Sequence, residues 1–88
     1  MQIETKSEAA AKLEGQVRRL LGAKAAGREI GIDDSLVDAG LTSLDLVKLM
    51  LAVEGEFDVT IPESELTPAS FRSIATMLDM LRRVGAKV

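Results

Sequence analysis

The apolar residues between positions 43 and 57 limit most strongly what this chain can fold into. They recur at intervals of three and four residues, which is the spacing of an α-helix, so a helix is predicted over Ser43 to Phe57. Its apolar residues are more than one face of a helix can hold. They are Leu44, Leu46, Val47, Leu49, Met50, Leu51, Val53 and Phe57.

These apolar residues divide into two sets. The first forms a stripe that is wide enough to face a core: Leu46, Leu49, Met50, Val53 and Phe57. The second lies on a separate flank: Leu44, Val47 and Leu51. Exposed apolar residues beside acidic residues are typical of a docking surface for a partner protein. The alternative is that a neighbouring loop covers them.

Three further helices are predicted, and strands have almost no support. Thr5 and Glu8 have the spacing of a capping box, and a first helix follows as far as the neighbourhood of Ala23. Its apolar positions are Ala9, Leu13, Val17, Leu20 and Leu21. Thr67 before Pro68 predicts a short third helix over roughly Pro68 to Phe71. Ser73 is expected to cap a last helix that closes the core with Ile74, Met77, Leu78, Leu81 and Val84.

A long connection separates the first helix from the helix at 43–57. Gly22 and Gly27 bracket the end of the first helix, and about 18 residues without a sustained period follow. Its apolar anchors are Ile30, Ile32, Leu36 and Leu41. The expected fold is therefore an all-α four-helix bundle in one domain, 1–88, with three longer helices and one short helix. So long a connection in a small domain is usually functional or mobile.

Composition excludes most kinds of catalysis. The 88 residues include no Cys and no His, so thiolate nucleophiles, disulfides, imidazole bases and nearly all transition-metal sites are excluded. No apolar run approaches the roughly 20 residues of a membrane span, and the N-terminus lacks the apolar stretch of a signal peptide. We therefore expect a cytoplasmic protein that does not bind membranes.

The charges are segregated along the chain. The net charge is +3 over residues 1–28, from three acids and six bases, and +3 over 67–88, from one acid and four bases. Residues 29–66 contain ten acids and one base, giving −9. Such a field attracts a basic partner surface and repels nucleic acid, so no nucleic-acid partner is expected. The alternative is that the acidic block is a solubilising face.

Two adjacent hydroxyls precede the helix at 43–57. Thr42 can cap this helix, with Asp45 adding negative charge at the positive end of the helix dipole. Ser43 then remains spare in the first turn. Because the chain has no His, Ser43 is not plausible as a nucleophile for a reaction of its own. It could be modified by another enzyme, since a helix N-terminus favours a phosphate ester, or it could do nothing.

The run "DAGLTSLDLVKLMLAVEGEFDVTIP" at residues 38–62 resembles the second-helix signature of acyl carrier proteins and peptidyl carrier domains. In that signature a Gly-Leu turn leads to a serine, followed by Leu, an acidic residue and a helix that ends in Glu-x-x-Phe. The resemblance implies that Ser43 carries a 4'-phosphopantetheine arm, attached from coenzyme A by a phosphopantetheinyl transferase. The arm would supply the thiol that the chain lacks, and an acyl or aminoacyl group would ride on it as a thioester.

The chain also departs from the family pattern. Thr42 stands where most fatty-acid carriers have Asp before the serine, and Lys48 and Gly55 stand at or near positions that tend to be acidic. The acids that remain along this helix and its end are Asp45, Glu54, Glu56 and Asp58. Because fewer acidic residues remain, electrostatic steering toward general fatty-acid synthase enzymes should be weaker. A specialised carrier with its own dedicated partners is therefore favoured. The residues expected at its docking surface are Thr42, Leu44, Asp45, Val47, Lys48, Leu51 and Glu54.

Three functional hypotheses follow from the resemblance. The first is a discrete, monomeric carrier in fatty-acid or secondary-metabolite biosynthesis, loaded by an acyl or aminoacyl ligase and used by downstream acyltransferases or synthases. It would catalyse nothing itself. The second is a carrier-like binding module without an arm, and the third is a domain excised from a multimodular synthase. The first is preferred to the third because the chain begins at Met1 and shows no Pro/Ser-rich linker.

Overall fold

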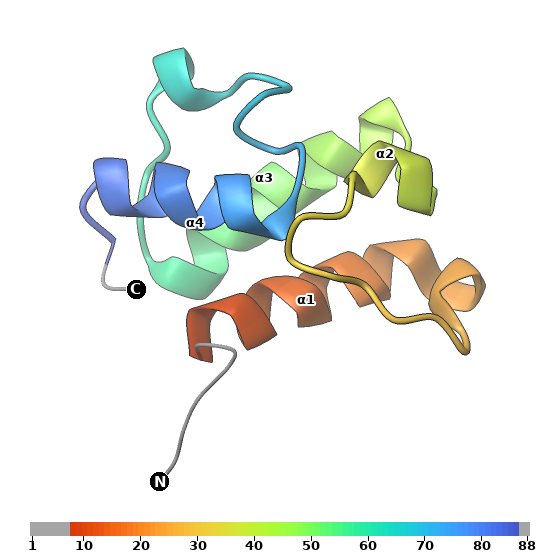
Figure 1. Ribbon diagram of the computed structural model, residues 1–88. Coiled ribbons are helices and arrows are strands. Elements are labelled where there is room, and N and C mark those ends of the chain that lie inside the picture. The colour runs from red at the N-terminus through yellow and green to blue at the C-terminus, as the bar shows by residue number, and fades with distance from the viewer. Residues whose placement is uncertain (1–7, 87–88) are drawn as a thin grey trace, which may run out of the picture.

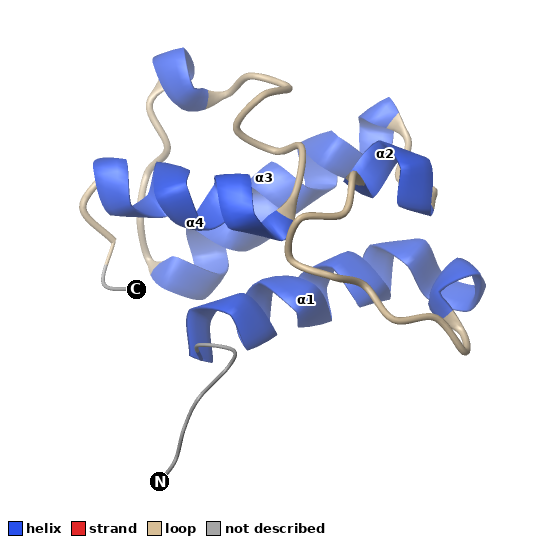
Figure 2. Ribbon diagram, in the orientation of Figure 1, coloured by secondary structure: helices blue, strands red, loops and turns tan. Residues whose placement is uncertain are grey.

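The computed structural model describes residues 8–86, and within that range the fold is all-helical (Figures 1 and 2). The longer helices are α1 (Glu8–Leu21), α3 (Ser43–Phe57) and α4 (Ile74–Arg83). The shorter elements are the 3-10 turn η1 (Gly22–Ala25), the one-turn helix α2 (Leu36–Ala39) and the 3-10 turn η2 (Glu63–Glu65). The expected all-α bundle is confirmed.

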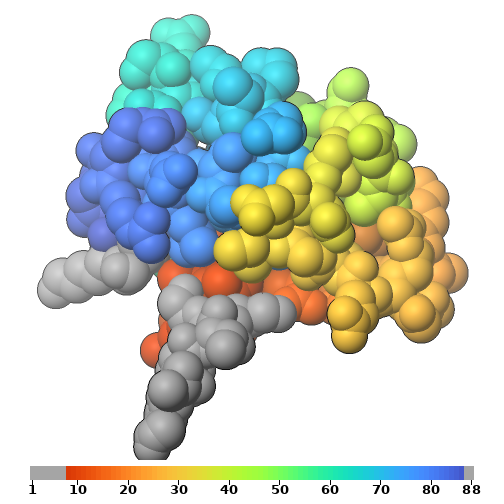
Figure 3. All heavy atoms as spheres, viewed as in Figure 1, coloured from red at the N-terminus to blue at the C-terminus, as the bar shows by residue number. Residues whose placement is uncertain are grey.

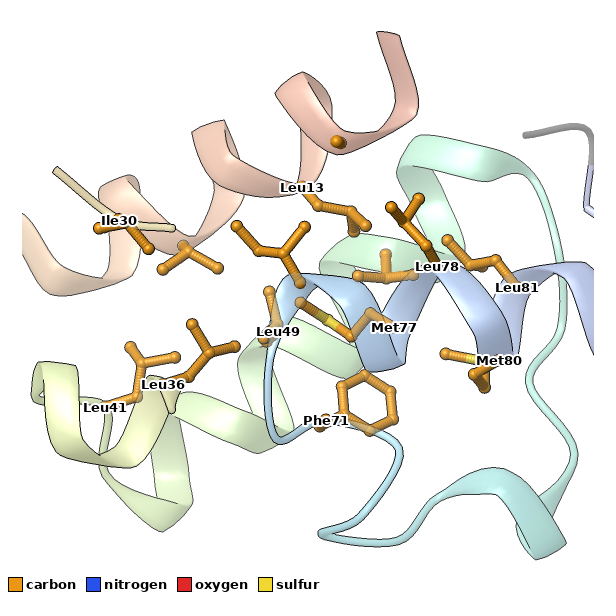
Figure 4. Packing of buried hydrophobic residues seen from close by; sticks show 14 of the residues in the cluster. Leu13, Ile30, Leu36, Leu41, Leu49, Phe71, Met77, Leu78, Met80 and Leu81 are labelled. Carbon is orange, nitrogen blue, oxygen red and sulfur yellow. The ribbon is translucent and has the colours of Figure 1, made fainter. Parts of the chain in front are cut away.

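The core lies where α1, α3 and α4 meet. Leu13 from α1, Leu49 from α3 and Met77 from α4 are each fully buried, and their side chains converge in Figure 4. The stripe predicted on α3 is confirmed, since Leu49 and Val53 are buried and the other three members pack against the core. The flank on the other side of α3 stays exposed, as expected. Leu44 is 63% exposed, Val47 46% and Leu51 65%.

The long connection contains more structure than the sequence pattern indicates. The sequence predicts no helix there, yet Leu36–Ala39 forms one turn of α-helix, capped by the Ser35 hydroxyl, which accepts the Asp38 N–H at 3.3 Å. The connection is also bonded to the start of α4, because the carbonyl of Ile32 accepts the Ala75 N–H at 2.8 Å. In Figure 3 this yellow segment lies against α4, in blue. Ile32 itself is 41% exposed, so its expected role as a buried anchor is wrong.

The prediction of a short helix at Pro68 to Phe71 is also wrong. These residues form a turn, with the Phe71 N–H bonded to the Pro68 carbonyl at 3.2 Å, and the short helical element is η2, earlier in the chain. Burial of the Phe71 side chain in the core ends the turn after a few residues, before a helix can propagate. The expected capping box at Thr5 and Glu8 lies partly outside the described residues, since Thr5 precedes them.

Candidate functional site

The turn that leads into α3 is fixed by Gly40. Its φ of +124° is a conformation that other residues rarely adopt, and a Cβ there would lie 2.9 Å from Cδ of Lys24. The N–H of Gly40 bonds to the carbonyl of Val37 and that of Leu41 to the carbonyl of Leu36, which closes α2 as a Schellman motif. The chain is therefore reversed sharply, and the next residues can start a new helix.

Two cations, Lys24 in η1 and Arg28 in the loop after it, hold this turn from outside. The Lys24 ammonium donates to the Gly40 carbonyl at 2.9 Å, and the Arg28 guanidinium donates to the Ala39 carbonyl at 2.9 Å. Positive side chains are favourable at the carbonyl end of a helix. The sequence pattern indicates neither residue, because Lys24 and Arg28 contact residues 16 and 11 positions away and follow no local pattern. One signal was available in the sequence: two basic residues lie close together after a helix and before a turn that contains Gly.

A complete capping box starts α3, as the sequence predicts for Thr42. The Thr42 hydroxyl accepts the Asp45 N–H at 3.1 Å, and the Asp45 carboxylate accepts the Thr42 N–H at 3.0 Å. The bond from the Thr42 backbone, with smaller help from its hydroxyl and from Lys48 and Lys24, lowers the pKa of Asp45 below the usual aspartate value. The carboxylate that was expected at a docking surface is therefore also a structural cap.

Ser43 is left in the position that the sequence suggests. Its side chain is exposed at the first position of α3, and no hydrogen bond joins its hydroxyl to any residue in the described range. The N–H groups of Ser43 and Leu44 likewise have no partner among the described residues, because the first turn of a helix has no earlier helical carbonyls to accept them. A free hydroxyl thus stands beside two free amides at the positive end of a 15-residue helix.

A shallow groove of about 230 Å³ opens at Ser43. We call it the α3 groove. One side is lined by Ser43, Leu46, Val47 and Met50, and the other by Leu66, Thr67, Pro68 and Phe71. The sequence pattern does not indicate the second side, because it comes from a segment without helical periodicity that folds back over α3.

The remaining residues expected at a docking surface are not all equally available. Lys48 is exposed, whereas Glu54 is half-buried and its carboxylate accepts the Ile61 N–H at 2.8 Å. Part of the negative charge predicted for this surface is therefore used within the chain. The apolar flank of Leu44, Val47 and Leu51, which we call the exposed strip, carries no such internal role. Val37 on α2 is also 58% exposed, which the sequence pattern did not indicate.

The acidic side chains of the described residues do not form a metal site. Within residues 8–86 no group of three or more acidic, His or Cys side chains could hold a metal ion, and no helix is long and apolar enough to cross a membrane. The features that the site does offer are an exposed hydroxyl, free helix-end amides and an adjoining apolar groove. This set fits a phosphodiester on Ser43, with the amides facing the phosphate and the groove receiving apolar atoms attached to it.

Comparison with known proteins identifies the same kind of site. The family model described as the phosphopantetheine attachment site matches residues 11–81. The chain is 48% identical to aminoacyl carrier protein 1 of Bradyrhizobium diazoefficiens over 65 residues, which are 74% of this chain and 72% of that protein. It is 43% identical to aminoacyl carrier protein 2 of the same organism, over 74% of this chain and 73% of that protein.

Solved structures agree with the sequence comparison. The fold is similar, with a TM-score of 0.76 and 40% identity, to a chain in the crystal structure of Bradyrhizobium japonicum glycine:[carrier protein] ligase complexed with glycylated carrier protein. The match covers 84% of this chain and 99% of that chain. The helical fold, the site at the start of α3 and the matching family model lead to one conclusion: this chain belongs to the carrier proteins that bear a covalently attached 4'-phosphopantetheine.

Proposed function

We propose that Ser43 is the residue that bears the arm, and that the loaded cargo is an aminoacyl group. The observation that carries the first part is the free Ser43 hydroxyl beside two free amides at the start of α3. In the attachment reaction, the Ser43 oxygen bonds to the phosphorus next to pantetheine in coenzyme A. The phosphoanhydride bond breaks, adenosine 3',5'-bisphosphate leaves, and the serine proton passes to a base of the transferase.

The other serines of the described range are poorer acceptors. The hydroxyl of Ser35 already caps α2, and the side chains of Ser70 and Ser73 are buried and hydrogen-bonded. Ser64 is exposed, but it lies in the three-residue η2 between Glu63 and Glu65. Two neighbouring carboxylates would repel a phosphodiester there, and so short an element offers little dipole to offset the repulsion.

The chain's own residues hold and orient the arm, and they do not catalyse its reactions. When bound, the arm supplies the thiol on which the cargo is held as a thioester. The α3 N-terminus stabilises the phosphodiester charge, the Thr42 and Asp45 capping box fixes the direction of α3, and the exposed strip presents the site to partner enzymes. With no His and no Cys in the sequence, we assign the chemistry of loading and transfer to those enzymes.

Two observations support an aminoacyl cargo. The relatives just described are named aminoacyl carrier proteins, and the similar chain comes from a structure of glycine:[carrier protein] ligase complexed with glycylated carrier protein. In addition, Lys48 is exposed one turn from the attachment site and would oppose a basic docking patch of a general fatty-acid synthase enzyme. The proposed partners are thus a phosphopantetheinyl transferase, an aminoacyl ligase and a downstream acyltransferase or synthase.

Mass spectrometry tests the attachment directly. The purified protein is incubated with coenzyme A and a broad-specificity phosphopantetheinyl transferase, and its intact mass is measured. One added arm is expected on the wild type and on Ser64→Ala, and none on Ser43→Ala, whose helix Thr42 still caps. An arm on Ser43→Ala would refute the assignment.

Loading is tested on the arm-bearing protein with ATP, a panel of amino acids and the glycine:[carrier protein] ligase of Bradyrhizobium japonicum. The parallel reaction uses malonyl coenzyme A and a fatty-acid synthase malonyl transferase. We expect thioester formation with an amino acid and little with malonyl. Efficient malonyl loading with no aminoacyl loading would show that the cargo assignment is wrong while leaving the attachment site intact.

A further inference from the structure

The segment 62–69, which contributes Leu66, Thr67 and Pro68 to the α3 groove and which we call the outer wall, is weakly attached to the rest of the fold. Between the buried residues Ile61 and Ser70, none of positions 62–69 is buried. Backbone hydrogen bonds within this segment, such as Leu66 N–H to the Glu63 carbonyl at 3.0 Å, hold only its local shape. In Figure 1 the segment, in turquoise, arches away from the helices before it returns to α4. The buried residues Ser70 and Phe71 anchor the end of this segment, so a further contact is needed to hold its start over α3.

An ion pair joins this wall to α4. The Arg83 guanidinium donates twice to the Glu65 carboxylate, from Nη2 at 2.7 Å and from Nε at 3.1 Å. The Ser70 hydroxyl donates to the same carboxylate at 3.2 Å. Glu65 therefore connects the start of the wall both to α4 and to its own buried end. Two parallel bonds from one guanidinium also fix direction, which a single contact does not.

We propose that the Glu65–Arg83 ion pair is a positioning element for the phosphopantetheine arm, because it holds the wall against which the arm lies in the α3 groove. The inference rests on the proposed attachment at Ser43, which itself lines this groove. The groove is smaller than the roughly 300 Å³ at which pockets for drug-sized ligands begin, so it receives only part of the arm.

The chemistry of the wall fits the part of the arm nearest the phosphate. Leu66 and Pro68, with Leu46 and Met50 opposite, offer an apolar surface that suits the two methyl groups of the pantoyl unit. When the ion pair holds the wall, the arm extends from Ser43 in one preferred direction. When the wall is released, the arm loses that direction but stays attached. Glu65 and Arg83 touch no reacting atom and act through Leu66, Thr67 and Pro68.

Amide NMR of the protein with and without the arm tests this role. In the wild type we expect attachment to shift the amide signals of Leu66, Thr67 and Phe71. Arg83→Gln should reduce these shifts by about 1.5-fold to fivefold. This range corresponds to the loss of one surface ion pair, and it applies because the small groove holds the arm only weakly. Glu65→Gln should act in the same direction, because it removes the charge but keeps an acceptor for Ser70.

Arg82→Gln is the matched control. It makes the same change one residue earlier in α4 and breaks the Arg82–Asp79 pair of 3.1 Å, whose two residues both lie on α4. Its shifts should equal those of the wild type, and circular dichroism should show folded protein for all variants. This inference alone would be overturned if attachment caused no shifts at the wall in the wild type. It would also be overturned if the shifts in Arg83→Gln and in Glu65→Gln both equalled those of the wild type. Failure of the arm to attach to Ser43 would overturn the proposed function and this inference together.

Discussion

Two leucines on α3 allow docking to be separated from stability. Leu49 is fully buried, whereas Leu51, two residues later on the same helix, is 65% exposed. Leu49→Ala should cost about 2 to 5 kcal/mol of unfolding free energy, because it leaves a cavity in the core. A chain of 88 residues has only about 4 to 13 kcal/mol in total, so this variant should be severely destabilised.

Leu51→Ala should instead weaken partner binding and leave the stability of the protein nearly unchanged. Complete burial of a leucine side chain contributes about 1.5 to 3 kcal/mol, and with 65% of Leu51 exposed, about 1 to 2 kcal/mol remains for a partner that covers it. The Kd or KM of the carrier for its ligase should therefore rise about 5-fold to 30-fold. The folded protein itself should lose at most about 1 kcal/mol.

Urea denaturation followed by far-UV circular dichroism measures the stability term, since the chain contains no Trp or Tyr for fluorescence. Ligase kinetics with varied carrier concentration measure the binding term. The reasoning is refuted if Leu51→Ala changes the KM of the carrier for its ligase by less than about twofold. It is equally refuted if the loss of stability in Leu51→Ala matches that in Leu49→Ala, because the exposed strip would then be part of the core.

Four further outcomes are expected. Thr42→Ala should cost about 0.5 to 2 kcal/mol of unfolding free energy through the lost cap, while mass spectrometry still finds the arm on Ser43. Gly40→Ala should cost on the order of 1 to 3 kcal/mol, because its φ is +124°, and should slow attachment of the arm; unchanged stability would mean that the turn can relax. The Thr42 N–H lowers the pKa of Asp45, and Arg83 lowers the pKa of Glu65. The stability that these carboxylates contribute is therefore full above the ordinary carboxylate pKa of about 4 and is lost as pH falls through the lowered values. NMR titration of both carboxylates checks the direction. The double change Thr42→Asp and Lys48→Glu should raise malonyl loading and lower aminoacyl loading, and equal rates for both proteins would mean that these positions do not select the partner.

The sequence predicted the parts of this site that follow from local rules. The spacing of apolar residues located α3 to the residue, and the hydroxyl of Thr42 with Asp45 three positions later predicted its cap. The exposure of the strip followed because α3 has more apolar residues than its buried face can take.

The parts that failed depend on contacts between distant segments. Pro68 has the local signal of a helix start, but burial of Phe71 in the core imposes a turn instead. The outer wall of the groove, the Lys24 bond to the Gly40 carbonyl and the Glu65–Arg83 pair each join residues at least 16 positions apart. No periodicity within one segment records such contacts.

The bonds between the long connection and α4 have a consequence for the order of folding. The Ala75 N–H bonds to the Ile32 carbonyl, and the Leu36 N–H bonds to the Arg72 carbonyl, both at 2.8 Å. Each bond closes a loop of nearly half the chain, which is an entropically expensive and therefore late step. Because Leu36 begins the turn that orients Ser43, a nascent chain that still lacks residues 72–75 lacks the bond that ties this turn to the start of α4. Synthesis of the last helix thus adds the final support to the turn that precedes Ser43.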